Sequence, residues 1–160
     1  MKKEFTPIIL AHQSILHKIC RVYRDTPEDR EDLFQEMIYQ LWKSYPTYQK
    51  KAKITTWIYR VALNTALTKY RKKQIATEPI VSSETETSEV QEHPQRERLY
   101  RAIARLNEAD KAIVTLYLDD YRYEEIADIL GMTTSHVGVK LHRIKEKLTH
   151  LLTPRTHDTG

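Results

Sequence analysis

The sequence has few of the residues that a β-rich fold needs, since only three of its 160 residues are glycine. Sandwiches and barrels require many tight turns and strands of alternating polarity, and neither pattern is visible. Cys20 is the single cysteine. No disulfide can therefore form within the chain, and the apolar neighbours of Cys20 favour a buried thiol. The sequence also shows no secretory leader and no apolar run that could span a bilayer, so we expect a cytoplasmic protein without direct membrane insertion.

Patterns for catalysis and metal binding are missing as well. The seven histidines are scattered and do not combine with Cys20 in the spacing of a metal site. There is no glycine-rich phosphate loop. We therefore expect no enzyme activity, no cofactor, no metal ion and no small-molecule substrate.

Charge is distributed unevenly along the chain. The net charge is +4, but residues 77–95 contain five glutamates and no lysine or arginine, which leaves 26 basic against 17 acidic residues elsewhere. A basic body is typical of proteins that bind nucleic acid or a membrane surface, although it also serves solubility. The acidic stretch is rich in Ser and Thr and poor in apolar residues. We interpret residues 74–97 as a flexible acidic linker.

Apolar residues recur at helical spacing on both sides of this linker. In the first part, Thr6-Pro7 and Thr26-Pro27 each predict a helix start, and a third helix is expected from Thr55 or Thr56. The apolar face expected for the second helix is formed by Leu33, Phe34, Met37, Ile38, Leu41 and Trp42. In the second part, Asn107 begins a pattern like a capping box.

These patterns predict an all-α fold with two small helical domains, residues 1–73 and 98–152, and a disordered tail at 153–160. Residues 123–137 predict a helix-turn-helix in the second domain. Gly131 can adopt the positive φ that ends one helix, and Thr133 or Thr134 can cap the next. In the DNA-binding form of this motif, the second helix places its early residues at base edges. An ordinary helical hairpin with a solvated basic face is the alternative.

Both parts of the chain resemble conserved regions of the sigma factors of bacterial RNA polymerase. Residues 106–114 and 123–127 resemble the fourth conserved region, and residues 137–148 resemble its recognition helix. Glu31-Asp32-Leu33-Phe34-Gln35-Glu36, Leu41-Trp42 and residues 56–64 resemble the second region. The resemblance covers about residues 8–73 and 98–150. The domain that separates these regions in housekeeping relatives is missing, which indicates the small alternative, extracytoplasmic-function type of the sigma-70 family.

The sequence departs from this family at three positions. Many relatives have proline where Asn107 stands, and Asn107 can cap the following helix equally well. Gly138 and Val139 stand where a basic and a small polar residue often occur. These differences weaken the transfer of base contacts from relatives to Gly138 and Val139.

The resemblance implies a sigma factor that binds core RNA polymerase and directs initiation at promoter DNA through minus-ten and minus-thirty-five elements, with an anti-sigma factor as a further partner. Polymerase contacts are expected at Asp32, Leu33, Phe34, Gln35 and Glu36. Minus-ten DNA contacts are expected at Tyr48, Lys50, Lys51, Lys53, Trp57, Arg60, Asn64, Lys69, Arg71 and Lys72. Minus-thirty-five DNA contacts are expected at Thr134, Ser135, His136, Lys140, His142, Arg143 and Lys147.

Side-chain chemistry supports these roles but leaves alternatives open. Aromatic faces can stack on unpaired bases while cations follow the backbone, and Tyr48 is the better stacking candidate because Trp57 is equally suited to a core. The basic run at residues 69–73 can bind phosphate or stabilise a helix C-terminus. A stand-alone helix-turn-helix regulator that does not need polymerase is the alternative function. A module that binds only proteins is a third reading.

Overall fold

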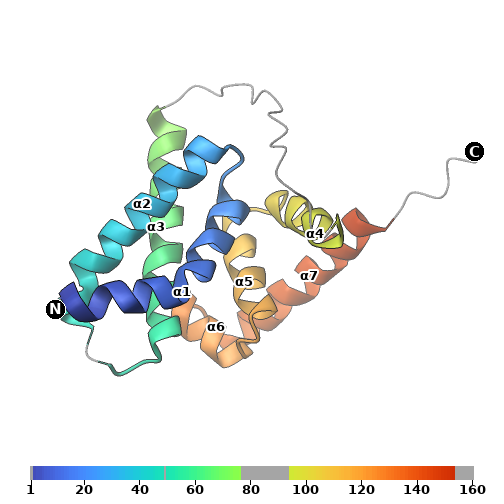
Figure 1. Ribbon diagram of the computed structural model, residues 1–160. Helices are drawn as coiled ribbons and strands as arrows, with labels where there is room; N and C mark the ends of the chain where they lie inside the picture. The colour runs from blue at the N-terminus through green and yellow to red at the C-terminus, as the bar shows by residue number, and fades with distance from the viewer. Residues whose placement is uncertain (1, 49, 77–93, 154–160) are drawn as a thin grey trace, which may run out of the picture. The chain divides into compact units, whose positions relative to one another are not determined.

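The computed structural model describes residues 2–48, 50–76 and 94–153 and divides the chain into two compact units, Met1–Glu89 and Val90–Gly160. All regular structure within the described residues is helical (Figure 1), which confirms the predicted fold class. None of the described helices combines the length and apolarity that crossing a membrane requires. Most of the predicted acidic linker, residues 77–93, and the predicted tail from residue 154 lie outside the described residues.

Helices extend into the predicted linker from both sides. Helix α3 (Ile54–Ala76) continues past residue 73, and α4 (Pro94–Ala104) begins four residues before the expected boundary at residue 98. Proline is well suited to a first helical position, because its φ is already helical and the missing N–H has no partner there anyway. Pro94 therefore explains the early start of α4.

The first unit contains α1 (Lys2–Tyr23), α2 (Pro27–Ser44), the short 3₁₀ turn η1 (Tyr45–Thr47) and α3 (Figure 1). The three α-helices all pack against one another. Their shared core is formed by side chains with no more than 1% exposure, including Leu16, Ile19, Leu33, Met37, Leu41, Ile58, Tyr59, Ala62 and Leu63. The periodic apolar residues thus meet in one core, as helical spacing predicts.

The predicted start of α1 at Thr6-Pro7 is wrong, because the helix begins at Lys2 and contains Pro7. Tertiary contacts explain the extra turn: Phe5 is buried, and its ring packs edge-on against Tyr45 with 5.5 Å between centroids. The backbone leaves helical geometry at His12 (φ −121°, ψ 17°), so α1 consists of two helical stretches.

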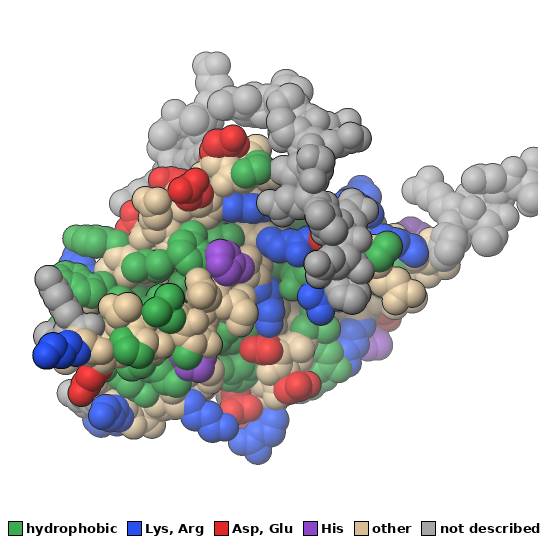
Figure 2. Space-filling view, viewed as in Figure 1, with side chains coloured by type: hydrophobic (Ala, Val, Ile, Leu, Met, Phe, Trp, Pro, Cys, Tyr) green, Lys and Arg blue, Asp and Glu red, His purple; other side chains and the backbone are tan. Residues whose placement is uncertain are grey.

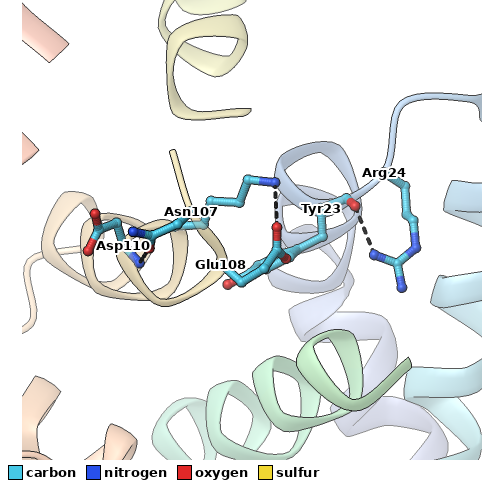
Figure 3. Close-up of polar contacts among 6 residues, drawn as sticks. Tyr23, Arg24, Asn107, Glu108 and Asp110 are labelled. Atoms are coloured by element: carbon cyan, nitrogen blue, oxygen red, sulfur yellow. Dashed lines mark hydrogen bonds and ion pairs between the residues drawn. The ribbon is translucent and has the colours of Figure 1, made fainter. Parts of the chain in front are cut away.

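The turn between α1 and α2 is closed by local hydrogen bonds. Thr26 caps α2 by accepting a bond from the backbone N–H of Asp29 (3.1 Å), which confirms the predicted helix start. Such a cap stabilises a helix by roughly 1 kcal/mol. Arg24 is buried and donates through Nη1 to the carbonyl of Tyr23 at 2.8 Å (Figure 3). Arg30 donates through Nε to the carbonyl of Arg24 at 3.0 Å, which ties the turn to α2.

Cys20 lies in the core of the first unit, as predicted, and burial raises the pKa of its thiol from 9.0 to about 12. We expect a disulfide exchange reagent to leave Cys20 unmodified at pH 8 in the native protein and to modify it fully in denaturant, because the thiolate is the reactive form. The thiolate forms more easily in the unfolded chain, so the free energy of unfolding should fall as pH rises above about 9. Rapid modification of the native protein would contradict this placement.

The second unit contains α4, α5 (Glu108–Leu118), α6 (Tyr123–Leu130) and α7 (Thr134–Leu152), and α7 contacts each of the other three helices. Apolar residues from all four helices form its core, including Ile103, Ile113, Leu116, Ile126, Val137, Leu141 and Ile144. The tight turn between α6 and α7 makes the predicted helix-turn-helix.

Three predicted helix signals of the second unit are confirmed. Asn107 caps α5 by accepting a hydrogen bond from the backbone N–H of Asp110 at 2.9 Å (Figure 3). Gly131 ends α6 with φ +71°, a conformation that costs glycine little because it has no Cβ. Of the two proposed caps of α7, Thr133 performs this role and accepts from the backbone N–H of His136 at 3.1 Å.

Candidate partner and nucleic-acid surfaces

The acidic motif on α2 divides between the core and the surface. Asp32 and Gln35 are exposed, and Glu36 is half-buried and accepts a hydrogen bond from Gln40 at 3.0 Å. Leu33 is completely buried, so its side chain packs in the core and does not reach a partner, which corrects its expected contact. Phe34 is half-buried and stacks on His17 with 4.6 Å between ring centroids. Asp32 and Gln35 are therefore accessible on the surface of α2, and Phe34 and Glu36 are partly accessible.

Two exposed aromatic side chains extend this surface. Tyr39 is 54% exposed and Trp42 is 46% exposed. Tyr39 is four residues after Gln35 and Trp42 three residues after Tyr39, so the three side chains follow one another along the outer side of α2. The sequence interpretation included Trp42 in the apolar face, and that assignment is wrong. The buried stripe runs through Leu33, Met37 and Leu41, and Trp42 lies about 100° around the helix from Leu41.

An aromatic cluster supports the loop that joins α2 to α3. Trp57 is only 7% exposed, and Tyr48 stacks on it with 5.0 Å between centroids and 27° between planes. Tyr45 meets Trp57 edge-on at 6.0 Å. Burial and the hydrogen bond that its hydroxyl donates to Glu4 raise the pKa of Tyr45. The hydroxyl of Tyr48 donates to the carbonyl of Ala52 at 2.7 Å, so this hydrogen bond and the stacking on Trp57 together hold the ring in place.

This cluster distinguishes the two stacking candidates. Trp57 packs beneath Tyr48, whereas Tyr48 is half-buried and keeps part of its surface accessible. A flat ligand can approach Tyr48 directly, but Trp57 only after Tyr48 moves. Tyr59, also in the same region of the sequence, is completely buried, and its hydroxyl accepts a hydrogen bond from Lys18 at 3.3 Å.

Exposed basic residues lie close in sequence to the residues of the aromatic cluster. Lys50, Lys51 and Lys53 are exposed in the loop, and Arg60 and Asn64 are exposed one turn apart on α3. The backbone of α3 also carries Lys69, Arg71 and Lys72, whose side chains lie outside the described residues. Loop and helix together offer cations and an amide that can both donate and accept.

The expected contact residues of α7 fall into two groups. Thr134, Ser135, His136, Arg143 and Lys147 are exposed. His142 is exposed too, and its Nε2 lies 2.9 Å from a carboxylate oxygen of Glu146. Lys140 is half-buried, and its ammonium lies 3.6 Å from the carboxylate of Asp110 on α5. The structure therefore presents most of the set outward but engages Lys140 within the unit.

Lys145 is a basic residue of α7 outside the expected set of minus-thirty-five contacts, and its ammonium lies 4.5 Å from the ring centroid of Tyr117. A hydrogen bond with Tyr117 raises the pKa of Lys145. Tyr123 lies beside Tyr117 with 6.4 Å between centroids. Lys145 thus contributes to packing between α5 and α7 through a cation–π contact. Sequence spacing could not reveal this, because the partner ring is on another helix.

Among the described residues, no group of three or more His, Cys, Asp or Glu side chains could hold a metal ion. Lys and Arg side chains occur at several separate places on the face drawn in Figure 2, with hydrophobic side chains between them. Such mixed surfaces suit contacts with a polyanion and with protein partners.

Comparison with known proteins assigns both units. Residues 8–75 match the family described as Sigma-70 region 2, and residues 96–148 match Sigma-70, region 4. The RNA polymerase sigma factor SigV of Bacillus subtilis is 28% identical over 89% of this chain and 90% of its own. The sigma-E factor of Haemophilus influenzae is 26% identical over 96% of this chain and 89% of its own.

Solved structures share the fold. The sigma factor RpoE of Bartonella quintana, crystallised with the anti-sigma factor NepR, has a TM-score of 0.72 and 17% identity and covers 94% of this chain and 97% of its own. CnrH, in complex with the cytosolic domain of CnrY, has a TM-score of 0.69 and 17% identity and covers 95% of this chain and 89% of its own. With both conserved regions matched in order, the chain belongs to the sigma-70 family and is a sigma factor of the extracytoplasmic-function type.

Proposed function

We propose that this protein binds core RNA polymerase and directs it to promoters through minus-ten and minus-thirty-five elements. The observation that carries this proposal is the match of two separately folded units, in order, to sigma-70 regions 2 and 4. This function needs no catalytic group of its own. Because transcription takes place in the cytoplasm, the protein should act there.

The outer side of α2 is the proposed polymerase-binding surface. It combines the carboxylates of Asp32 and Glu36 with the exposed rings of Tyr39 and Trp42. Interfaces commonly depend on a few aromatic anchors, with polar groups around them that set specificity. Gln35 lies between these groups and can both donate and accept.

The loop after α2 and the exposed side of α3 form the proposed minus-ten surface. Tyr48 offers its ring for stacking, and Trp57 supports it from beneath. Lys50, Lys51 and Lys53 can follow the backbone of a melted strand, as cations do in single-strand binding. Arg60 and Asn64 continue this surface along α3, with Lys69, Arg71 and Lys72 as further proposed phosphate contacts.

Helix α7 is the proposed reader of the minus-thirty-five element. Thr134, Ser135 and His136 occupy its first turn, where a helix in the major groove reaches base edges. Arg143 lies two turns later and can bond guanine or phosphate. The set is completed by Lys140, His142 and Lys147 as proposed phosphate contacts.

The ion pair between Lys140 and Asp110 should limit the charge that α7 offers to DNA. Asp110→Asn is expected to raise promoter affinity of the holoenzyme and to make log K fall more steeply with log salt by about one unit, because one more phosphate contact becomes available. Equilibrium binding over a salt series measures this slope. Glu108→Gln is the matched control, since Glu108 lies in the same helical turn but pairs with Lys111 at 3.1 Å. Equal slopes for wild type and Asp110→Asn would show that Lys140 does not reach DNA.

An anti-sigma factor is a further proposed partner. The related structures contain sigma factors bound to the anti-sigma factor NepR and to the cytosolic domain of CnrY. An exposed aromatic surface on α2 would suit such a protein as well as polymerase. Competition between polymerase and a purified candidate partner for the wild-type protein would test this proposal.

A stand-alone helix-turn-helix regulator is the alternative that must be separated from a sigma factor. The distinguishing property is whether core polymerase is needed for specific DNA binding. We expect electrophoretic mobility shifts on promoter fragments only when the protein and core polymerase are both present. Specific shifts by the protein alone, at affinities unchanged by core polymerase, would favour the regulator.

A further inference from the structure

Val139 is an exposed branched side chain on the outer side of α7. It is 51% exposed. Helical geometry places it opposite the buried stripe of this helix, which is formed by Val137, Leu141, Ile144 and Leu148. A single exposed valine needs no special explanation on an ordinary surface. The position of Val139 within the proposed DNA-reading surface is what gives it a role.

The neighbours of Val139 on this side, at spacings of three and four, are the exposed polar residues Ser135, His136, His142 and Arg143. His136 is three residues earlier and Arg143 four residues later, and both are exposed. Lys140 is drawn toward Asp110 on α5. Gly138 presents no side chain and lies against the ring of Tyr123, since a Cβ there would be 3.6 Å from the ring. The two methyl groups of Val139 thus lie between the potential hydrogen-bond donors His136 and Arg143.

Thymine is the base that matches this arrangement. In the major groove, only thymine presents a methyl group, at C5, whereas the other bases present hydrogen-bonding groups. A valine in a helix strongly prefers one χ1 rotamer, so its methyl groups are fixed before DNA arrives. Burying a methyl group between apolar atoms is favourable, and the hydrogen-bonding neighbours would fix the register.

We propose that Val139 is a specificity-determining residue that recognises the methyl group of a thymine in the minus-thirty-five element. This inference rests on the proposed function, because it requires α7 to lie in the major groove. It assigns to Val139 a contact that does not depend on hydrogen bonds. It also predicts a preference for thymine over cytosine at one position, since cytosine has no methyl group.

The test uses holoenzyme and a promoter selected from a randomised minus-thirty-five element. Each thymine of the selected element is replaced in turn by deoxyuridine, which removes only the methyl group. We expect one replacement to lower wild-type affinity by about fourfold, the effect of one buried methyl group. Holoenzyme with Val139→Ala should bind thymine and deoxyuridine promoters equally. Leu118→Ala is the control, because Leu118 is also an exposed aliphatic residue but lies at the end of α5.

The outcomes separate this inference from the function on which it rests. If wild-type holoenzyme binds the selected promoter but no deoxyuridine replacement matters, Val139 does not read a methyl group and the sigma assignment stands. A deoxyuridine effect of equal size in wild type and Val139→Ala would also overturn the inference. Failure to select any promoter with core polymerase would remove both the proposed function and the inference.

Discussion

Replacing Trp42 by alanine is expected to lower affinity for core RNA polymerase about thirtyfold, the effect of losing ~2 kcal/mol at an interface hot spot. Trp42 and Tyr39 are large exposed aromatic side chains on the outer side of α2, next to the acidic motif. Such rings bury much area with little loss of conformational freedom. Tyr39→Ala should have a similar effect. Titration of core polymerase with fluorescently labelled protein measures both affinities.

Leu10 supplies the control for this prediction, because it is an exposed aliphatic residue on α1 and not on α2. Leu10→Ala should bind polymerase like wild type. Leu33→Ala should behave differently from all three variants and lower the free energy of unfolding by about 2–5 kcal/mol, since Leu33 is completely buried. Thermal unfolding followed by circular dichroism separates the two effects. Wild-type polymerase affinity in folded Trp42→Ala and Tyr39→Ala proteins would rule out this surface.

His136→Ala and Arg143→Ala are expected to change which minus-thirty-five sequence is preferred. A base contact contributes roughly 1–3 kcal/mol of discrimination, whereas a phosphate contact weakens binding to all sequences alike. Both residues are exposed on α7. Lys147→Ala, one turn beyond Arg143, should lower affinity uniformly and reduce its salt dependence.

A randomised minus-thirty-five element transcribed by each variant holoenzyme measures these preferences. Wild type and Lys147→Ala should enrich the same sequence, with lower yield for the variant. His136→Ala and Arg143→Ala should each relax the preference at one or two positions. Identical enriched sequences for all four proteins would show that neither His136 nor Arg143 reads a base.

Helix ends could be predicted from the sequence where they depend on residues within one helical turn. The caps at Thr26 and Asn107 depend on residues three positions away, and Gly131 depends on its own missing Cβ. Such signals lie within one helical turn and are readable without knowledge of the fold. The helix-turn-helix and the all-α fold followed from them and from apolar periodicity.

Features that depend on a contact with another helix could not be predicted from the sequence. Helix α1 extends to the N-terminal side of Pro7 because Phe5 packs against Tyr45, which is forty residues later in the sequence. Lys140 resembles any exposed lysine of a basic helix until Asp110 of α5 is placed beside it. These are tertiary contacts that override local preference.

Trp57 and Trp42 are two further residues whose burial depends on tertiary packing. The sequence left open whether Trp57 is a core residue. The structure buries its side chain beneath Tyr48, so Trp57 packs as a core residue. The sequence did not separate Trp42 from the core, because Phe34, Ile38 and Trp42 have the same spacing of four as the buried Leu33, Met37 and Leu41. The apolar character of tryptophan favoured the wrong assignment.

Transcription in vitro tests the central claim most directly. Purified bacterial core polymerase is incubated with fragmented genomic DNA of the source organism, with and without this protein, and the 5′ ends of the transcripts are mapped. We expect new start sites only when the protein is present, preceded by two shared sequence elements at minus ten and minus thirty-five. At limiting protein concentration, Trp42→Ala should yield far fewer of these transcripts, in line with its lower affinity for core polymerase. Specific DNA binding without core polymerase, together with no new start sites, would contradict the assignment.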